Sequence, residues 1–72
     1  DLEGLAGVEF NKALFFIVDG DIDKAKYHMH RSETIAFPFP YKEEKTERRR
    51  VFIERMEGIG HKFNEKDFID PQ

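Results

Sequence analysis

The sequence predicts a small all-α domain built from three helices, and three observations support this prediction. Apolar residues recur at spacings of three and four over residues 2–18, 22–36 and about 44–63, which is the period of one helix face. The tripeptide DGD (19–21) separates the first two segments, and the proline-containing stretch FPFPY (37–41) separates the second from the third. The predicted architecture is an antiparallel helical hairpin, a proline elbow and a third helix.

The length of 72 residues suits one domain, and we expect residues 1–72 to form a single helical domain. A domain of this size buries only roughly 60% of its unfolded surface, so its core is small. The sequence contains no cysteine, which excludes disulfides and thiolate metal sites. Chains of this kind often gain stability by association.

The first helix, expected over residues 2–18, carries a broad apolar stripe. Its members are Leu2, Leu5, Ala6, Phe10, Ala13, Leu14 and Ile17. The run ALFFIV (13–18) is apolar on every side and is too short to span a membrane. We interpret it as the end of a central helix that is covered from two directions and is the most buried of the three.

The stretch DGD (19–21) is interpreted as the turn of the hairpin. Gly20 is placed to adopt the left-handed conformation that ends a helix, and Asp21 is a good N-cap for the helix expected over residues 22–36. Asp23 then lies in the first turn, where the helix dipole favours a negative charge. The inner face of this second helix is formed by Ile22, Ala25, Met29, Ser32 and Ala36.

The second helix is expected to stop at the proline elbow. Pro38 and Pro40 lack amide donors and favour extended conformations in the residues before them. The aromatic residues of the elbow are expected to fold back as a lid on the helix ends, with a recognition surface as the alternative. They are Phe37, Phe39 and Tyr41.

The third helix, expected over residues 44–63, has a heptad-like apolar stripe. The stripe consists of Phe52, Met56, Ile59 and Phe63. Gly58 and Gly60 in the last turns predict a kink, an end or a close backbone contact. Beyond the helix, two apolar residues are expected to tuck back into the core and a proline to end the ordered chain: Phe68, Ile69 and Pro71.

The acidic turn also matches the opening of an EF-hand calcium loop, because Asp19, Asp21 and Asp23 occupy its first three ligand positions. However, Lys24 stands where the loop needs a glycine for its sharp turn. His30 stands where the loop needs a bidentate glutamate. A calcium site is therefore not predicted.

Two histidines follow the turn, His28 and His30. On a helix, a separation of two residues rotates them by about 200°, so they face opposite ways and cannot share one metal ion. His61 could reach one of them only through the tertiary fold. A metal-binding hairpin stays as the second alternative function, and no metal ligand is assigned.

We expect no enzymatic activity, no cofactor and no catalytic residue. There is no cysteine nucleophile, and Ser32 lacks the glycine-rich elbow of a nucleophilic serine. The segment EGLAG (3–7) is not followed by the lysine and serine or threonine of a phosphate-binding loop.

A charged stretch opens the third helix and gives the first alternative function, nucleic-acid binding. Its basic strip consists of Lys45, Arg48, Arg49 and Arg50. The spacings of Glu44 with Arg48 and of Arg50 with Glu54 predict surface ion pairs. The formal net charge of −3 is mild, so we favour a solvated helix face over a nucleic-acid interface.

Residues 8–36 resemble one tetratricopeptide-type hairpin. The matching residues are Ala13, Phe16, Gly20, Asp21, Ile22, Ala25 and Ser32. Glu9 and Lys12 depart from the motif, which has large apolar residues at their positions, and no second repeat follows, whereas such arrays need about three units. We interpret the likeness as a shared hairpin geometry; membership would imply peptide or protein binding.

The leading prediction for function is a protein-interaction module, expected to self-associate as a homodimer. Apolar residues crowd the end of the first helix and the elbow in larger number than two thin neighbouring helices can cover, and a leftover apolar patch marks an interface. The candidate interface residues are Phe10, Leu14, Phe15, Phe16, Val18, Phe37, Phe39 and Tyr41. No membrane association is expected, and the cysteine-free composition and acidic start lead us to expect a cytoplasmic protein.

Overall fold

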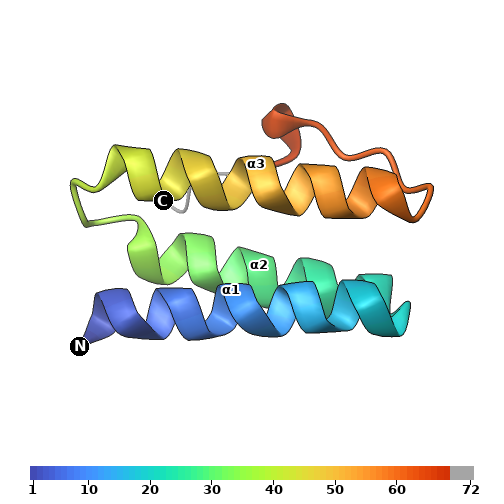
Figure 1. Ribbon diagram of the computed structural model, residues 1–72. Helices are drawn as coiled ribbons and strands as arrows, with labels where there is room; N and C mark the ends of the chain where they lie inside the picture. Colours follow the sequence, from blue (N-terminus) through green and yellow to red (C-terminus); the bar gives the residue numbers. More distant parts are fainter. Residues whose placement is uncertain (69–72) are drawn as a thin grey trace.

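The computed structural model describes residues 1–68, and within this range every regular element is helical. The elements are α1 (Leu2–Asp19), α2 (Ile22–Ala36), α3 (Lys42–Gly58) and a short 3-10 turn, η1 (Glu65–Asp67). Helices α1 and α2 form an antiparallel hairpin, α3 lies along it, and the segment after α3 runs back beside α3 (Figure 1). The predicted three-helix architecture is confirmed. The predictions for Ile69 and Pro71 lie outside the described residues.

The turn between α1 and α2 forms as the sequence predicts. Gly20 adopts the left-handed conformation with φ of 81°, and its amide donates to the Ile17 carbonyl at 3.0 Å. The amide of Asp21 donates to the Phe16 carbonyl at 2.9 Å, which completes a common helix-ending motif. The Asp21 carboxylate then accepts a hydrogen bond from the Lys24 amide at 3.2 Å and so caps α2.

Small residues allow α1 and α2 to approach closely. Side chains that are completely buried include Ala6, Ala13, Ala25, Ser32 and Ala36. The Ser32 hydroxyl donates to the Ala6 carbonyl at 2.7 Å, so the polar side chain is satisfied across the helix contact. The prediction that Ser32 lies on the inner face of α2 is confirmed.

The hydrophobic core joins all three helices. Its buried members are Ala13, Ile17, Ala25, Met29, Phe52 and Met56. Phe52 of α3 contacts the rings of Phe63 and Phe68, with centroid distances of 5.1 and 6.0 Å. The segment that follows α3 therefore closes the core, and the prediction that Phe68 tucks back is confirmed.

Helix α3 is shorter at its C-terminus than predicted. It ends at Gly58, not near residue 63, because Gly60 adopts a left-handed conformation with φ of 86°. The amide of His61 donates to the Met56 carbonyl at 2.9 Å and stops the helix in the same way as the first turn. Ile59 is consequently exposed, and Phe63 reaches the core from outside the helix.

The apolar stripe predicted for α1 is partly wrong. Leu2 and Leu5 are exposed, whereas the buried positions of the helix are Ala6, Glu9, Ala13 and Ile17. The end of α1 is covered on one side only. Helix α2 has five buried residues and α1 four, so α1 is not the most buried helix. The physical reason is that the neighbouring helices pack on the alanine-rich side of α1.

Candidate protein-interaction surface

The predicted interface residues of α1 divide into two groups. Phe10, Leu14 and Phe16 are half-buried and pack against the core. Phe15 and Val18 point to solvent, with 63% and 81% of their surface exposed. The spare apolar surface at this end of the helix is therefore smaller than the sequence suggested, and it lies opposite the core.

Two further exposed apolar residues of α1 are absent from the predicted interface, and one of them, Val8, extends this surface toward the N-terminus. Leu5 and Val8 are 49% and 48% exposed. We call the following residues the outer face of α1: Gly4, Gly7, Val8, Asn11, Phe15 and Val18. The positions Val8, Asn11, Phe15 and Val18 follow one another at spacings of three, four and three, which was the signal in the sequence that could have identified this face.

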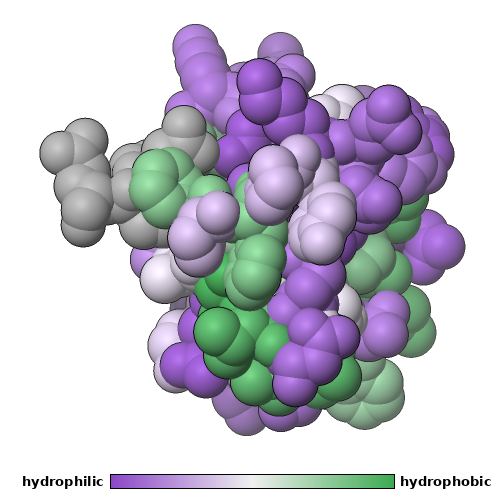
Figure 2. Space-filling model, turned by 90° about the vertical axis from the view of Figure 1, so that its left-hand side faces the viewer, coloured by the Kyte–Doolittle hydropathy of each residue, from purple (hydrophilic) through white to green (hydrophobic). Residues whose placement is uncertain are grey.

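The elbow forms a second, smaller apolar surface. Phe37 and Tyr41 are exposed, so the predicted lid on the helix ends is wrong for both, and Phe39 is half-buried with its ring 6.3 Å from that of Tyr41. Lys45 fixes the elbow by donating from Nζ to the carbonyls of Phe37 and Phe39. Figure 2 shows this end of the molecule, where hydrophobic atoms gather chiefly in the lower half, the level of α1 in Figure 1.

A buried carboxylate links α1 to α2 on the side of α1 that faces α2. Glu9 is only 5% exposed, and its Oε1 lies 3.0 Å from Nδ1 of His28 and 2.7 Å from Nε of Arg31. Lys12 lies 3.5 Å from the other oxygen. The hydrogen bond with His28, then that with Arg31 and the charge of Lys12, hold the pKa of Glu9 at about 2, although burial alone would raise it.

The partners of Glu9 are themselves held by aromatic rings. The imidazole of His28 stacks on Phe16 at 5.2 Å, and Tyr27 meets it edge-on at 5.1 Å. The guanidinium of Arg31 lies 5.9 Å from the Tyr27 ring. This cluster fastens the hairpin and leaves Glu9 no open side, so it is a structural ion cluster. In the sequence, the signal for this cluster was Glu9, a charged residue at a position where the tetratricopeptide-type hairpin has an apolar residue.

The four residues of the predicted basic strip each interact with groups of the chain. Lys45 binds the elbow carbonyls, and Arg49 pairs with the buried Glu33. Arg50 pairs with Glu54 at 2.6 Å, as predicted, and also with Glu47, whose pKa it lowers.

Arg48 differs from the prediction. It does not point along its own helix toward Glu44, and instead places Nη1 3.4 Å from Glu3 of α1. Both side chains are largely buried, and three of their atoms have no hydrogen-bond partner: Glu3 Oε2, Arg48 Nε and Arg48 Nη2. The guanidinium of Arg48 therefore belongs to the contact between α1 and α3.

The acidic turn and the histidines do not meet. Asp21 caps α2, His28 binds Glu9, and His30 lies on another side of α2. Among residues 1–68, no group of three His, Cys, Asp or Glu side chains is placed to hold a metal ion.

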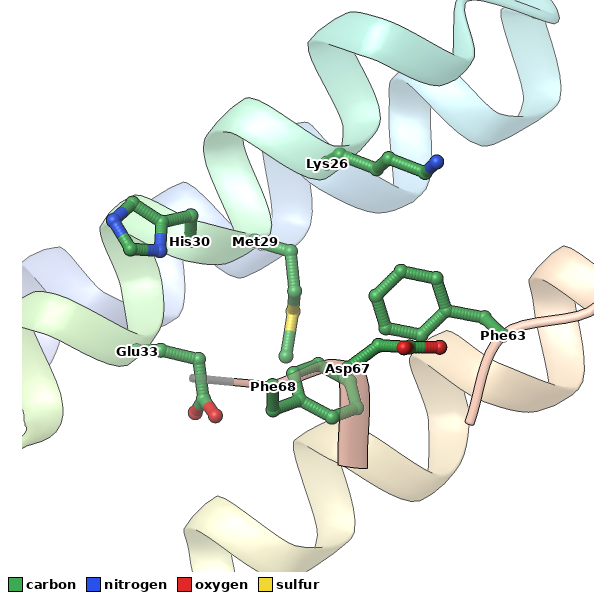
Figure 3. A pocket seen from close by; sticks show the side chains of 7 residues that line it. All are labelled: Lys26, Met29, His30, Glu33, Phe63, Asp67 and Phe68. Carbon is green, nitrogen blue, oxygen red and sulfur yellow. The ribbon is translucent and has the colours of Figure 1, made fainter. Parts of the chain in front are cut away.

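A small cavity of about 190 Å³ lies between α2 and the segment after α3 (Figure 3). Met29, Phe63 and Phe68 form its apolar floor, and Lys26 and Asp67 stand at its edge. Pockets for drug-sized ligands are usually about 300–1,000 Å³. The cavity is thus too small for a ligand of that class.

Among the described residues, no helix has the length and apolar character needed to cross a membrane. No family model matches the chain, and neither the curated proteins nor the solved structures contain a similar protein. Its function is therefore inferred from its own side chains.

Proposed function

We propose that this protein is a non-enzymatic protein-interaction module and that the outer face of α1 is its docking surface. The observation that supports this proposal is the group of three exposed apolar side chains, Val8, Phe15 and Val18, on one side of one helix. Single exposed apolar residues are normal on protein surfaces, whereas several on one face often mark an interaction site.

The size of this surface is suited to binding another helix. Three side chains of roughly 150–200 Å² that are half to four-fifths exposed present together about 300 Å² of apolar surface. An amphipathic helix laid along α1 would remove this surface from water. The elbow residues Phe37 and Tyr41 offer a second contact at one end.

Nucleic-acid binding is the weaker alternative. A protein that binds phosphates needs cations that are free to displace counterions. Arg48 is largely buried against Glu3, and Arg50 pairs with Glu47 and Glu54.

A cytoplasmic location remains the expectation from the cysteine-free composition.

A photo-cross-linking experiment tests the docking surface. Benzoylphenylalanine is introduced in place of Phe15, and in a matched control in place of Glu57, which is exposed on α3. Both proteins are irradiated in purified form and in cells that contain the native protein. We expect adducts from position 15 and none from position 57. Equal adducts from both positions, or none from position 15 in either setting, would overturn the proposal.

A further inference from the structure

Two glycines lie inside α1 without any role within the chain. Gly4 and Gly7 are both helical, and glycine is the least favourable helix residue apart from proline. A Cβ atom at Gly7 would meet nothing within 4 Å, and one at Gly4 would meet only Asp1 in the preceding turn. Neither glycine has a positive φ. The packing and backbone of a single copy therefore do not explain them.

Both glycines lie on the outer face of α1, in its N-terminal half, whereas Phe15 and Val18 lie in its C-terminal half. The N-terminal half of the face therefore has two positions without a side chain, and the C-terminal half has two large side chains. Asn11, exposed and polar, stands between the two halves. Such a face is complementary to itself when one copy is reversed.

Accordingly, we infer that the outer face of α1 binds the same face of a second copy in an antiparallel arrangement, with a two-fold axis at Asn11. This inference rests on the proposed function and names its partner. Positions equally spaced about residue 11 then face each other: Gly4 lies opposite Val18, and Gly7 lies opposite Phe15. The glycines form holes that accept the large side chains of the other copy.

The polar centre of the face fits the same arrangement. An asparagine amide both donates and accepts hydrogen bonds, so the two Asn11 side chains can pair across the axis. A buried asparagine in a helix seam sets the register of pairing. A parallel arrangement in register would instead place each glycine against the same glycine of the other copy.

Charge does not oppose the middle of the contact. Lys12 is the charged side chain nearest the middle of the face, and it is paired with Glu9 of its own chain at 3.5 Å. The antiparallel arrangement also sets the two helix dipoles in opposition, which is favourable. The two ends of the contact are acidic, because the same symmetry places Asp19 of one copy opposite Glu3 of the other, so added salt should strengthen the association.

The expected area sets the strength of the dimer. The apolar row and its flanks would bury about 500 Å² on each copy, or about 1,000 Å² in total, which is the lower limit for a specific interface. We therefore expect a concentration-dependent dimer, not a permanent one.

Disulfide trapping tests the axis, because the chain has no cysteine of its own. In an Asn11→Cys variant the two thiols would face each other across the axis within the reach of a disulfide. In a Val18→Cys variant they would lie about 20 Å apart along the helices. We expect fast oxidation to a covalent dimer for Asn11→Cys only. Equal trapping of both variants, or none for Asn11→Cys, would overturn the inference.

The glycine Gly7 provides a second test. A Gly7→Ala variant should raise the melting temperature of the dilute monomer by about 3–5 °C and weaken self-association at least tenfold. The matched control is Gly58→Ala in α3, where a Cβ also meets nothing; it should leave self-association unchanged. An unchanged dissociation constant for Gly7→Ala would contradict the inference.

The two proposals can fail separately. If the cross-linker at position 15 captures a different protein while Asn11→Cys gives no covalent dimer, the docking surface stands and the self-partner is wrong. If neither gives a product, both are wrong.

Discussion

The Glu9 carboxylate of α1 lies 2.7 Å from Nε of Arg31 of α2, across a hairpin contact that is otherwise lined by small side chains. Burying a carboxylate is costly unless it is paired, and here the Nδ1 atom of His28 is a second partner. The pairing therefore ties the two helices together at a position where apolar packing alone would be simpler.

Replacing Glu9 should destabilise the fold. In Glu9→Ala the partners on α2 lose their acceptor, and we expect the free energy of unfolding to fall by about 1–3 kcal/mol. Urea denaturation monitored by circular dichroism measures this change. The matched control is Glu57→Ala on the exposed side of α3, for which we expect a change below about 0.5 kcal/mol. Equal losses for the two variants would contradict the structural role of Glu9.

The free energy of unfolding should also depend on pH within a defined range. The pKa of Glu9 is held at about 2 in the folded protein, below its usual value of 4.5. The unfolded chain therefore binds a proton first as pH falls, and the stabilisation, fully present above about pH 4.5, is lost between pH 4.5 and 2. Unfolding midpoints of wild type and Glu9→Gln should differ most at pH 6–7 and converge near pH 2. A gap that does not narrow in acid would contradict the assignment.

Ser32 should tolerate only a smaller side chain. Its hydroxyl donates to the Ala6 carbonyl at 2.7 Å in a completely buried contact. Ser32→Ala removes one hydrogen bond and should cost about 0.5–1.5 kcal/mol. Ser32→Leu would force the helices apart and should cost at least about 1–3 kcal/mol. Thermal unfolding compares the two, and a leucine variant as stable as the alanine variant would show that the contact is loose.

The ion pair between Glu3 and Arg48 should be replaceable as a pair but not singly. Its largely buried groups are 3.4 Å apart, and three of their polar atoms lack partners. Glu3→Leu alone leaves the guanidinium without its carboxylate and should cost about 1–3 kcal/mol. The double variant Glu3→Leu with Arg48→Met should be at least as stable as wild type. A double-mutant cycle by urea denaturation measures the coupling, and additive losses would refute it.

The sequence by itself determined the helical class, the hairpin and the positions of its breaks. Gly20 and Asp21 end one helix and start the next through backbone conformation and hydrogen bonds to residues at most five positions away. Pro38 and Pro40 also act locally because they lack amide donors, but the extended conformation predicted before them is wrong for Phe37, which has φ of -51° and ψ of -47°. Such signals are read directly from neighbouring residues. The end of α3 was misplaced because Ile59 and Phe63 continue the apolar spacing of the helix, whereas the left-handed conformation of Gly60 ends it.

Only the tertiary structure decided which side of α1 is inside. Both sides of this helix carry apolar residues, so periodicity could not distinguish Leu5, which is exposed, from Ala6, which is buried. The choice follows from the close approach of α2, which small side chains permit and large ones would prevent. The same packing brought Glu9 to Arg31 and Glu3 to Arg48, residues 22 and 45 positions apart in the chain. Contacts at that separation depend on how whole helices pack, and no local pattern encodes them.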